Sequence, residues 1–294
     1  MNTNNLEFCV IGCGRLGISL AVFLSKQGFI PGAFCSKNPD SSKKALNFAG
    51  QGKIYENAAD AAKTCNIIFI TTPDAVIQRV CEQISEAGGF KSGSTVYHLS
   101  GALSSDILVS AKKNSAFTGS IHPLQAFAPY KTGQKSPFKG INMSIEGDEK
   151  AVGLGKEIVS ALNANSFTIP TDAKTVYHAS AVVASNYLVT LEHFALTLLK
   201  TANLSESAAY EILEPLILGT LNNIKARGSI NALTGPVARG DDKIVSLHLK
   251  SIDEKMPRFS ELYRLLGSYT LDIAVRRREI SKASVDKLSG LFKF

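Results

Sequence analysis

The stretch of sequence that decides the fold is Leu6-Glu7-Phe8-Cys9-Val10-Ile11-Gly12-Cys13-Gly14-Arg15-Leu16-Gly17. It joins an apolar run of strand length to a Gly-x-Gly-x-x-Gly motif, and a helical pattern follows and ends before Gly28. A strand, a glycine-rich turn and a helix in this order are typical of the first unit of a dinucleotide-binding domain. The order therefore predicts an α/β fold that begins at residue 6.

Each glycine of the motif has a physical role in such a turn. Gly12 permits the tight bend, Gly14 lets the backbone approach a pyrophosphate, and Gly17 lets the helix pack closely on the strand. The N-terminus of the following helix offers free amide groups and a partial positive charge to the phosphates. Such a turn can also be purely structural, but its place between strand and helix favours binding. We predict that the cofactor contacts Gly12, Cys13, Gly14, Arg15, Leu16 and Gly17.

Further apolar runs of strand length follow in the first half of the chain. We expect strands at Ile30–Cys35, Asn66–Ile70, Thr95–Leu99, Ala116–Ile121 and Asn142–Ile145. The runs are nearly continuous in apolar residues and are separated by helical patterns, which is typical of a parallel sheet covered by helices on both faces. Residues 1–170 are therefore predicted to form a doubly wound α/β domain.

From Thr171 onward the pattern is helical throughout. We expect helices at Asp172–Lys200, Ser205–Arg227, Asp241–Lys255 and Arg258–Arg278. Pro215 predicts a kink or a break inside the second of these helices. Gly228 lies where a helix C-cap requires a positive φ. Residues 171–294 are therefore predicted to form an all-helical domain.

The end of the second strand indicates which dinucleotide is bound. An enzyme that uses NAD usually has an acidic residue there, which binds the ribose 2′-hydroxyl. This chain has Ser36 and Lys37 instead, and a hydroxyl and a cation suit a 2′-phosphate. Asp40 would repel that phosphate, but its position after Pro39 favours a role as the N-cap of the next helix. The sequence therefore favours NADPH over NADH.

Two later strand ends are expected to line the nicotinamide side of the same crevice, because ligands bind outside the carboxyl ends of such strands. They carry Thr71-Thr72-Pro73 and Ser100-Gly101. Small polar residues before a turn are also common in loops that bind no ligand. Their position in the expected topology makes them candidates for cofactor binding.

Three segments carry candidate residues for the substrate. His122 follows the strand Ala116–Ile121 and is fixed by Pro123, although a loop histidine can also have no role. His178 and Asn186 are spaced i and i+8 on the first long helix, where they either contact substrate or bond to neighbouring protein groups. Thr234 and Arg239 belong to a Gly- and Pro-shaped loop. Arg239 either clamps a substrate carboxylate or pairs with a protein carboxylate.

Composition narrows the class of protein. Hydrophobic residues make up 45% and charged residues 19%, which is typical of a globular chain. No apolar run approaches the roughly 20 residues that span a bilayer, and the N-terminus lacks the pattern of a secretory signal. We therefore expect a cytoplasmic protein with no membrane partner.

The formal net charge of +7 is spread along the chain, and its one dense cluster, Arg276–Arg278, has no aromatic residues beside it. We expect no nucleic-acid partner, since an anionic cofactor and an anionic substrate also favour a basic surface. The five cysteines include no Cys-x-x-Cys pair, so we expect neither a disulfide framework nor a metal site.

Taken together, four segments resemble one protein family. They are the glycine motif, His122-Pro123-Leu124 with Phe127, His178 with Ala184-Ser185-Asn186-Tyr187, and Thr234-Gly235-Pro236 with Arg239-Gly240-Asp241. They are similar to Rossmann-like reductases with a helical C-terminal domain once described as of unknown function, some of which serve as alternative ketopantoate reductases. The resemblance covers nearly the whole chain, and it extends more broadly to the 6-phosphogluconate and β-hydroxyacid dehydrogenase superfamily.

The resemblance implies an NADPH-dependent reduction of ketopantoate to pantoate, in pantothenate and coenzyme A synthesis, by a homodimer joined through its C-terminal helices. In the superfamily a lysine usually stands four residues before the helix asparagine, but Val182 stands there in this chain. We expect His178 to donate a hydrogen bond instead, with Lys174 as the alternative. Asn186 and Ser100 would orient the substrate, His122 and Thr234 would line its site, and Arg239 or a nearby lysine would meet its carboxylate.

Three alternatives remain open at this stage. The first is a pyrroline-5-carboxylate reductase of the same build, and the second is a prephenate dehydrogenase, which runs in the oxidative direction. The third is an NADPH-binding sensor without turnover.

Overall fold

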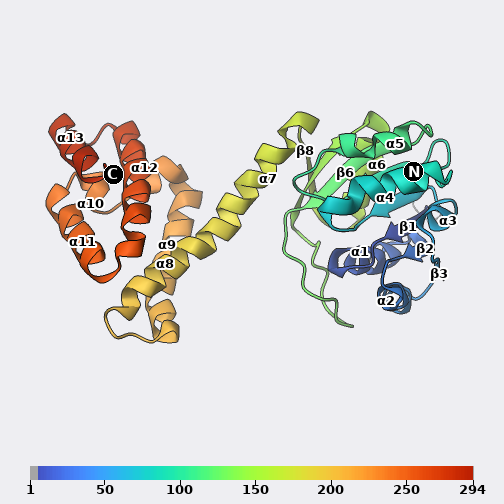
Figure 1. Cartoon of the computed structure of the whole chain (residues 1–294), viewed down its shortest axis with the longest axis horizontal. Coiled ribbons are helices and arrows are strands. Elements are labelled where there is room, and N and C mark those ends of the chain that lie inside the picture. Colours follow the sequence, from blue (N-terminus) through green and yellow to red (C-terminus); the bar gives the residue numbers. More distant parts are fainter. Residues whose placement is uncertain (1–5, 294) are drawn as a thin grey trace. The chain divides into compact units, whose positions relative to one another are not determined.

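The computed structural model of the chain describes residues 6–293, and its contacts divide the chain into two compact units between Ala184 and Ser185 (Figure 1). The first unit holds a sheet and the helices packed on it. The division falls later in the chain than residue 170, because the helix after the last strand contacts the sheet through Lys174 and Tyr177.

The first unit is built on an eight-stranded sheet with the strand order β3-β2-β1-β4-β5-β6-β7-β8. The strands are β1 (Glu7–Ile11), β2 (Ile30–Cys35), β3 (Lys53–Ile54), β4 (Ile67–Ile70), β5 (Thr95–His98), β6 (Phe117–Pro123), β7 (Asn142–Gly147) and β8 (Asn165–Thr168). The six expected strands are confirmed, with ends that differ by one or two residues. The sequence did not predict β3 and β8, because these edge strands are short and largely exposed and so carry no apolar run.

One pair of strands departs from the expected parallel arrangement. All neighbouring strands are parallel except β6 and β7, which run antiparallel. A parallel pairing requires a long crossover, usually a helix, to return the chain to the same end of the sheet. The connection over residues 124–141 forms no helix, so β7 starts near the end where β6 finishes.

Helices cover both faces of the sheet, as predicted (Figure 1). One face carries α1 (Arg15–Ser25), α2 (Pro39–Ala49) and α6 (Glu149–Ala161), and the other carries α3 (Ala58–Ala62), α4 (Asp74–Glu86) and α5 (Val109–Lys112). Along β1 the side chains alternate between the two apolar clusters, with Phe8 and Val10 in one and Cys9 and Ile11 in the other. The sheet is therefore the inner layer of a three-layer unit.

The five cysteines all belong to this unit. Cys9, Cys13, Cys35, Cys65 and Cys81 are buried free thiols. Burial raises the pKa of each of them above its ordinary value. Cys9 and Cys35 are small core residues of one apolar cluster.

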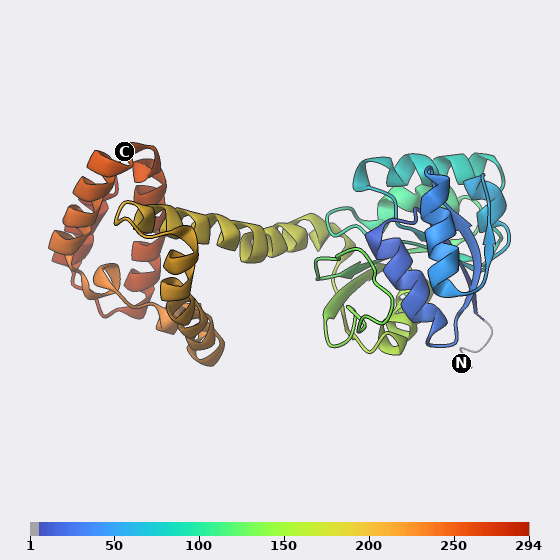
Figure 2. The same cartoon turned by 90° about the horizontal axis from the view of Figure 1, so that it is seen from below.

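The second unit is helical, as predicted, and Figure 2 shows it as orange and red helices joined by loops. Its helices are α8 (Leu188–Lys200), α9 (Glu206–Ala232), α10 (Pro236–Arg239), α11 (Asp242–Lys255), α12 (Ser260–Arg277) and α13 (Lys282–Leu291). Helices α10 to α13 bury a common apolar cluster around Val245, Leu271 and Leu288. Asp241 caps α11 by accepting a hydrogen bond from the Ile244 amide. The helix α13 was not among the expected elements.

Helix α9 differs from its prediction at two residues. No break occurs at Pro215, because Glu211 and Pro215 are exposed and water can solvate the carbonyl that loses its amide donor. The backbone leaves helical geometry at Gly228 instead, with φ 75° and ψ 161°. The positive φ expected for Gly228 is confirmed, but helical turns resume after it and continue to Ala232.

The chain is helical from Thr171 to Lys200, through a 3₁₀ turn, α7 (Lys174–Val182), a π-helical turn (Val183–Tyr187) and α8. This stretch is long and apolar enough to cross a membrane, so the expectation that no segment has the required length is wrong. The expectation was based on unbroken apolar runs. In this stretch the large apolar residues are separated mainly by Ala, Ser and Thr, so its mean hydropathy is high although no single run is long. Only 11% of its 18-residue apolar stretch is buried, and length and composition alone do not distinguish a membrane span from an apolar helix of a soluble protein.

The buried Tyr97 provides a test of the core. Its hydroxyl donates a 2.6 Å hydrogen bond to the Ala151 carbonyl, which joins β5 to α6. We expect Tyr97→Phe to lower the free energy of unfolding by about 1 kcal/mol, because one buried hydrogen bond is lost without a change of shape. Urea unfolding followed by circular dichroism measures the change. Tyr269→Phe, at a side chain that is 65% exposed, is the control and should change nothing; equal stability of both variants would contradict the assignment.

Candidate functional site

The strand order reverses direction at β1. The chain runs outward from β1 to β2 and β3 on one side, and then places β4 and the later strands on the other side of β1. In sheets of this kind ligands bind in the crevice outside the carboxyl ends of the strands at that point. The glycine motif follows β1 and Thr71-Thr72-Pro73 follows β4. The structure therefore brings these two predicted binding segments together.

The glycine turn packs tightly against the loop after β4. Gly12 has a φ of +100°, and a Cβ there would lie 2.7 Å from the Thr72 amide nitrogen. A Cβ on Gly17 would lie 2.5 Å from the Gly12 carbonyl oxygen. A Cβ on Gly14, by contrast, would meet no protein atom within 4 Å. The packing thus requires glycine at residues 12 and 17, whereas Gly14 leaves its backbone open to a ligand.

The first turn of α1 has amide groups available for an anion. Its N-cap, Gly14, makes no side-chain hydrogen bond to these amides, and the turn contains no acidic residue. In α2 and α3 one amide of the first turn donates to a capping side chain, that of Asn38 in α2 and that of Asn57 in α3. Unpaired amides at a helix N-terminus carry partial positive charge, so this turn fits a phosphate group. Arg15, the first residue of α1, is exposed beside it.

The loop after β4 contributes two threonines with different partners. The Thr71 hydroxyl donates to the Gly12 carbonyl and so joins the two loops. The Thr72 hydroxyl is buried and has no hydrogen-bond partner among residues 6–293. A buried hydroxyl without a partner costs free energy, so a bound ligand that accepts this bond would stabilise the site. Pro73 is the N-cap of α4 and is exposed.

A cavity of about 850 Å³ lies at the carboxyl end of β2. Ser36, Lys37 and Lys43 are among the residues that line it. The Lys37 side chain is exposed and forms no ion pair within the described part of the chain. Cys13 belongs to the buried wall of the neighbouring turn, where burial raises the pKa of its thiol to about 12.

Asp40 is not the N-cap of α2, so that expectation is wrong. The cap is Asn38, whose side chain accepts a 3.0 Å hydrogen bond from the Asp40 amide. Pro39 occupies the first helical position, where its fixed φ suits the helix, and this leaves the residue before it as the cap. Asp40 lies in the first turn, and its carboxylate forms a 3.5 Å ion pair with Lys43.

The hydroxyl of Ser100, after β5, is engaged within the protein. It donates a 2.8 Å hydrogen bond to the Asp74 carboxylate and accepts bonds from the amides of Ala102 and Leu103. It therefore shapes the loop after β5 and ties it to the start of α4. The expected role of Ser100 in orienting the substrate would require it to exchange one of these partners.

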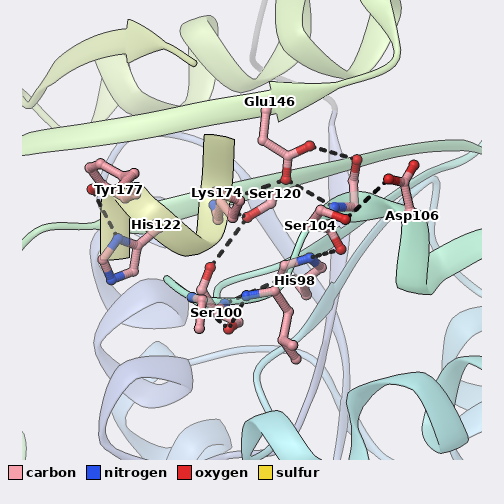
Figure 3. Close-up of polar contacts among 12 residues, drawn as sticks. His98, Ser100, Ser104, Asp106, Ser120, His122, Glu146, Lys174 and Tyr177 are labelled. Atoms are coloured by element: carbon pink, nitrogen blue, oxygen red, sulfur yellow. Dashed lines mark hydrogen bonds and ion pairs between the residues drawn. The ribbon is translucent and has the colours of Figure 1, made fainter. Parts of the chain in front are cut away.

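Two histidine side chains lie close to Gly101, and Figure 3 shows one of them, His122, with its partner Tyr177. His122, near the end of β6, forms a 3.1 Å hydrogen bond through Nδ1 with the hydroxyl of Tyr177. The His122 ring also lies 5.8 Å from the ring of His178, centroid to centroid. A Cβ on Gly101 would come within 2.5 Å of His178 Nδ1 and 2.7 Å of His122 Nε2. The structure thus brings together Gly101, His122 and His178, which the sequence predicted from three separate segments.

The electrostatics keep His122 neutral at pH 7. Burial lowers the pKa of this imidazole to about 4, and the positive charges of Lys174 and His178 act in the same direction. A neutral imidazole donates a hydrogen bond through one nitrogen and accepts one through the other. His178 Nδ1 is buried without a hydrogen-bond partner among the described residues. The cluster therefore offers the neutral imidazole of His122 beside a His178 nitrogen that is open to a ligand.

Lys174 lies beside His122 and Tyr177, next to Ser120 (Figure 3). Its ammonium donates a 2.6 Å hydrogen bond to the Ser120 hydroxyl and lies 4.0 Å from the Glu146 carboxylate. Burial lowers the pKa of Lys174 to about 8, although Glu146 and Asp74 favour its charged form. The Glu146 carboxylate also accepts bonds from the amide and the hydroxyl of Ser105. Lys174, the alternative proton donor, is thus enclosed by protein groups.

The other predicted substrate residues belong to the second unit. Asn186 is exposed and lies in the π-helical turn, so the α-helical spacing that grouped it with His178 does not apply there. Thr234 and Arg239 are also exposed. The Arg239 guanidinium has no hydrogen bond or ion pair within residues 6–293, so pairing with a protein carboxylate is not observed.

Sequence reasoning assigned no role to Tyr177, Asp74 or Glu146. Tyr177 stands next to His178, and its spacing of three residues from Lys174 could have placed it on the same helix face. Asp74 and Glu146 gave no comparable signal, because their partners come from distant parts of the chain.

Comparisons with known proteins agree with this architecture. Residues 1–123 match the family model of a Rossmann-like domain, and residues 141–270 match that of a domain of unknown function (DUF2520). No match is found among curated proteins. The doubly wound, Rossmann-like fold followed by a helical region is therefore established.

Several solved structures share the fold along nearly the whole chain. A proposed NADP oxidoreductase from Bacteroides fragilis is 21% identical, with a TM-score of 0.72, and the match covers 92% of this chain and 100% of that one. A protein from Thermotoga maritima is 25% identical, with a TM-score of 0.70 and coverages of 92% and 99%. A pyrroline-5-carboxylate reductase from Coxiella burnetii is 14% identical, with a TM-score of 0.57 and coverages of 100% and 100%.

The packed Gly17 and the open Gly14 can be tested separately. We expect Gly17→Ala to lower the free energy of unfolding by about 1–3 kcal/mol, because its Cβ would overlap the Gly12 carbonyl. Gly14→Ala should leave stability nearly unchanged, because its φ of −79° suits alanine and its Cβ would enter open space. Thermal unfolding of the two variants measures both effects. Equal loss in both would show that Gly14 is constrained by the fold and not reserved for a ligand.

Proposed function

We propose that this chain is an NADP-dependent oxidoreductase that reduces a small, anionic keto acid. The observation that carries the proposal is the glycine turn, which leaves Gly14 and the first amides of α1 open at the point where the sheet winding reverses. This arrangement fits a dinucleotide pyrophosphate. The similar fold of the Bacteroides fragilis protein, a proposed NADP oxidoreductase, supports the same cofactor.

The residues at the end of β2 favour NADPH over NADH. Ser36 and Lys37 line the cavity there and offer a hydroxyl and a cation to a 2′-phosphate. Asp40 is paired with Lys43, which offsets its repulsion of an anion. The buried Thr72 hydroxyl has no partner in the described residues, which supports a ligand on the nicotinamide side. The further cofactor contacts proposed on this side are Thr71, Pro73, Ser100 and Gly101.

When bound, NADPH supplies the hydride that reduces the substrate double bond. The side chains of the chain itself then have to orient the substrate and bond to its developing negative oxygen. His122 suits this task, because its neutral imidazole is held by Tyr177 and can donate through Nε2 beside Gly101. His178 is a second candidate donor at the same place. Orientation alone can lower a barrier by roughly 7–11 kcal/mol, so a strongly acidic group is not required.

Ketopantoate is the leading substrate candidate, and its support is the resemblance of His122, Asn186 and the Thr234–Asp241 loop to alternative ketopantoate reductases. The exposed, unpaired Arg239 suits a carboxylate, with Thr234 and Asn186 as further contacts. The second candidate is a cyclic imine. Its support is the similar fold of the pyrroline-5-carboxylate reductase, together with the neutral state of His122, since a protonated imine needs no acid.

We further propose that the chain forms a homodimer through its helical unit. Large apolar side chains on α8 and α9 are exposed, among them Val189 at 68%, Leu216 at 67% and Ile212 at 56%. An apolar surface of this kind is typical of an interface between protein chains.

A substrate panel tests the proposed activity. Purified chain is incubated with NADPH or NADH and with ketopantoate, other α-keto acids or cyclic imines, and loss of the reduced nicotinamide absorbance is followed. We expect turnover of ketopantoate with NADPH preferred. Turnover confined to imines would replace ketopantoate by a cyclic imine as the proposed substrate. NADPH binding without any turnover would support an NADPH-binding sensor instead.

Asn186 provides a test of the substrate site. We expect Asn186→Ala to lower kcat/KM on the order of tenfold or more, as for a lost substrate hydrogen bond, with NADPH affinity nearly intact. Asn47→Ala, at an exposed asparagine of α2, is the matched control and should leave both quantities unchanged. Steady-state kinetics and NADPH fluorescence titration give the two readouts. Unchanged kinetics in Asn186→Ala would remove this residue from the site.

A further inference from the structure

Lys174 is a charged side chain in a position where charge is costly. Its side chain is 1% exposed, and so is that of Glu146, the carboxylate 4.0 Å away. Removing an ammonium from water costs free energy that an ion pair offsets only when the geometry is good. The short bond of Lys174 goes to the neutral Ser120 hydroxyl, and the Glu146 oxygens are already bonded to Ser105. The charge of Lys174 is therefore not explained by an optimal ion pair.

The place of Lys174 in α7 indicates what the ammonium does. Lys174, Tyr177 and His178 are spaced i, i+3 and i+4, so they share one face of the helix. Ser120 and His122 are spaced i and i+2 in β6, so they share one face of the strand. Two hydrogen bonds join these faces. The buried one links Lys174 to Ser120, and the partly exposed one links Tyr177 to His122 (Figure 3). Two consecutive contacts thus fix the start of α7 on the strand end that carries His122.

We propose that Lys174 is a positioning residue: its buried ammonium fixes the first turn of α7 on Ser120 and so holds Tyr177 against His122, and its positive charge adds to burial in disfavouring protonation of the His122 imidazole. The role in the reaction rests on the proposed function. The effect on His122 does not, because it depends on contacts within the first unit alone.

The charged and titratable groups around His122 come from four elements. Lys174, Tyr177 and His178 act on it from α7 and His98 from β5, whereas Glu146 in β7 and Asp74 in α4 act on Lys174. Lys174 acts on both strand-end histidines, since its charge contributes to the lowered pKa of His98, to about 3, as well as that of His122. Glu146 and Asp74 oppose it by favouring the charged form of Lys174. The sign of the effect is clear: removing the Lys174 charge must raise the pKa of His122.

Nuclear magnetic resonance of the imidazole groups tests the electrostatic part directly. Histidine Cε1–H signals of the full chain are followed between pH 5 and 8, and the signal absent in His122→Asn is assigned to His122. In the unsubstituted protein His122 should remain mostly neutral at pH 5, because its pKa is about 4. In Lys174→Met the midpoint should rise by on the order of one pH unit, which makes His122 about half protonated at pH 5.

Lys156→Met is the matched control, because Lys156 is an exposed lysine of α6 in the same unit. It should leave the His122 titration unchanged. Lys174→Gln covers the case in which Lys174→Met does not fold, since it removes the charge but keeps a donor for Ser120. An unchanged His122 midpoint in the folded Lys174 variant would overturn the proposal.

The pH profile of kcat/KM tests the role in the reaction. In the Lys174 variant the loss of activity at low pH should begin about one unit higher than in the unsubstituted protein, in step with the His122 titration. A shifted titration with an unshifted activity profile would overturn the positioning role. If the unsubstituted protein turns over no substrate at all, the proposed function fails, whereas the resonance titration still decides the effect of Lys174 on His122.

Discussion

The contact between the glycine turn after β1 and the threonine loop after β4 is the constraint on which the rest of the first unit depends. A Cβ on Gly12 or Gly17 would overlap backbone atoms of this contact, so neither strand end can move without the other. The contact fixes the direction of α1 and leaves its first amides facing the crevice. The loops after β5 and β6 extend the same edge of the sheet, which is why Ser100, Gly101 and His122 lie in sequence along it.

Much of this architecture could be predicted from the sequence, because it depends on local patterns. Continuous apolar runs gave six strands, and the glycine spacing gave the turn and the helix. The edge strands β3 and β8 lacked such a pattern, since exposed strands need no apolar face. Pro215 was misleading for a different reason: a proline breaks a helix less readily where water can solvate the freed carbonyl.

The candidate site was predictable only at the level of strand ends. The sequence placed His122, Gly101 and His178 near one another, but it gave no means to see that Tyr177 holds His122 or that Asp74 holds Ser100. These bonds join residues 26 to 55 positions apart, and their geometry depends on how helix and strand faces pack. Lys174 is the clearest case, because a buried ammonium is contrary to the usual exposure of lysine and becomes intelligible only beside Ser120 and Glu146.

The distribution of the five cysteines has a practical consequence. All of them are buried in the sheet unit, between residues 9 and 81, and the helical unit has none. A thiol reagent attacks the thiolate of an accessible cysteine, and here burial both shields the sulfur and raises its pKa. The rate of thiol labelling therefore reports opening of the sheet unit alone. The native sequence thus contains its own probe for distinguishing local unfolding of one unit from unfolding of the whole chain.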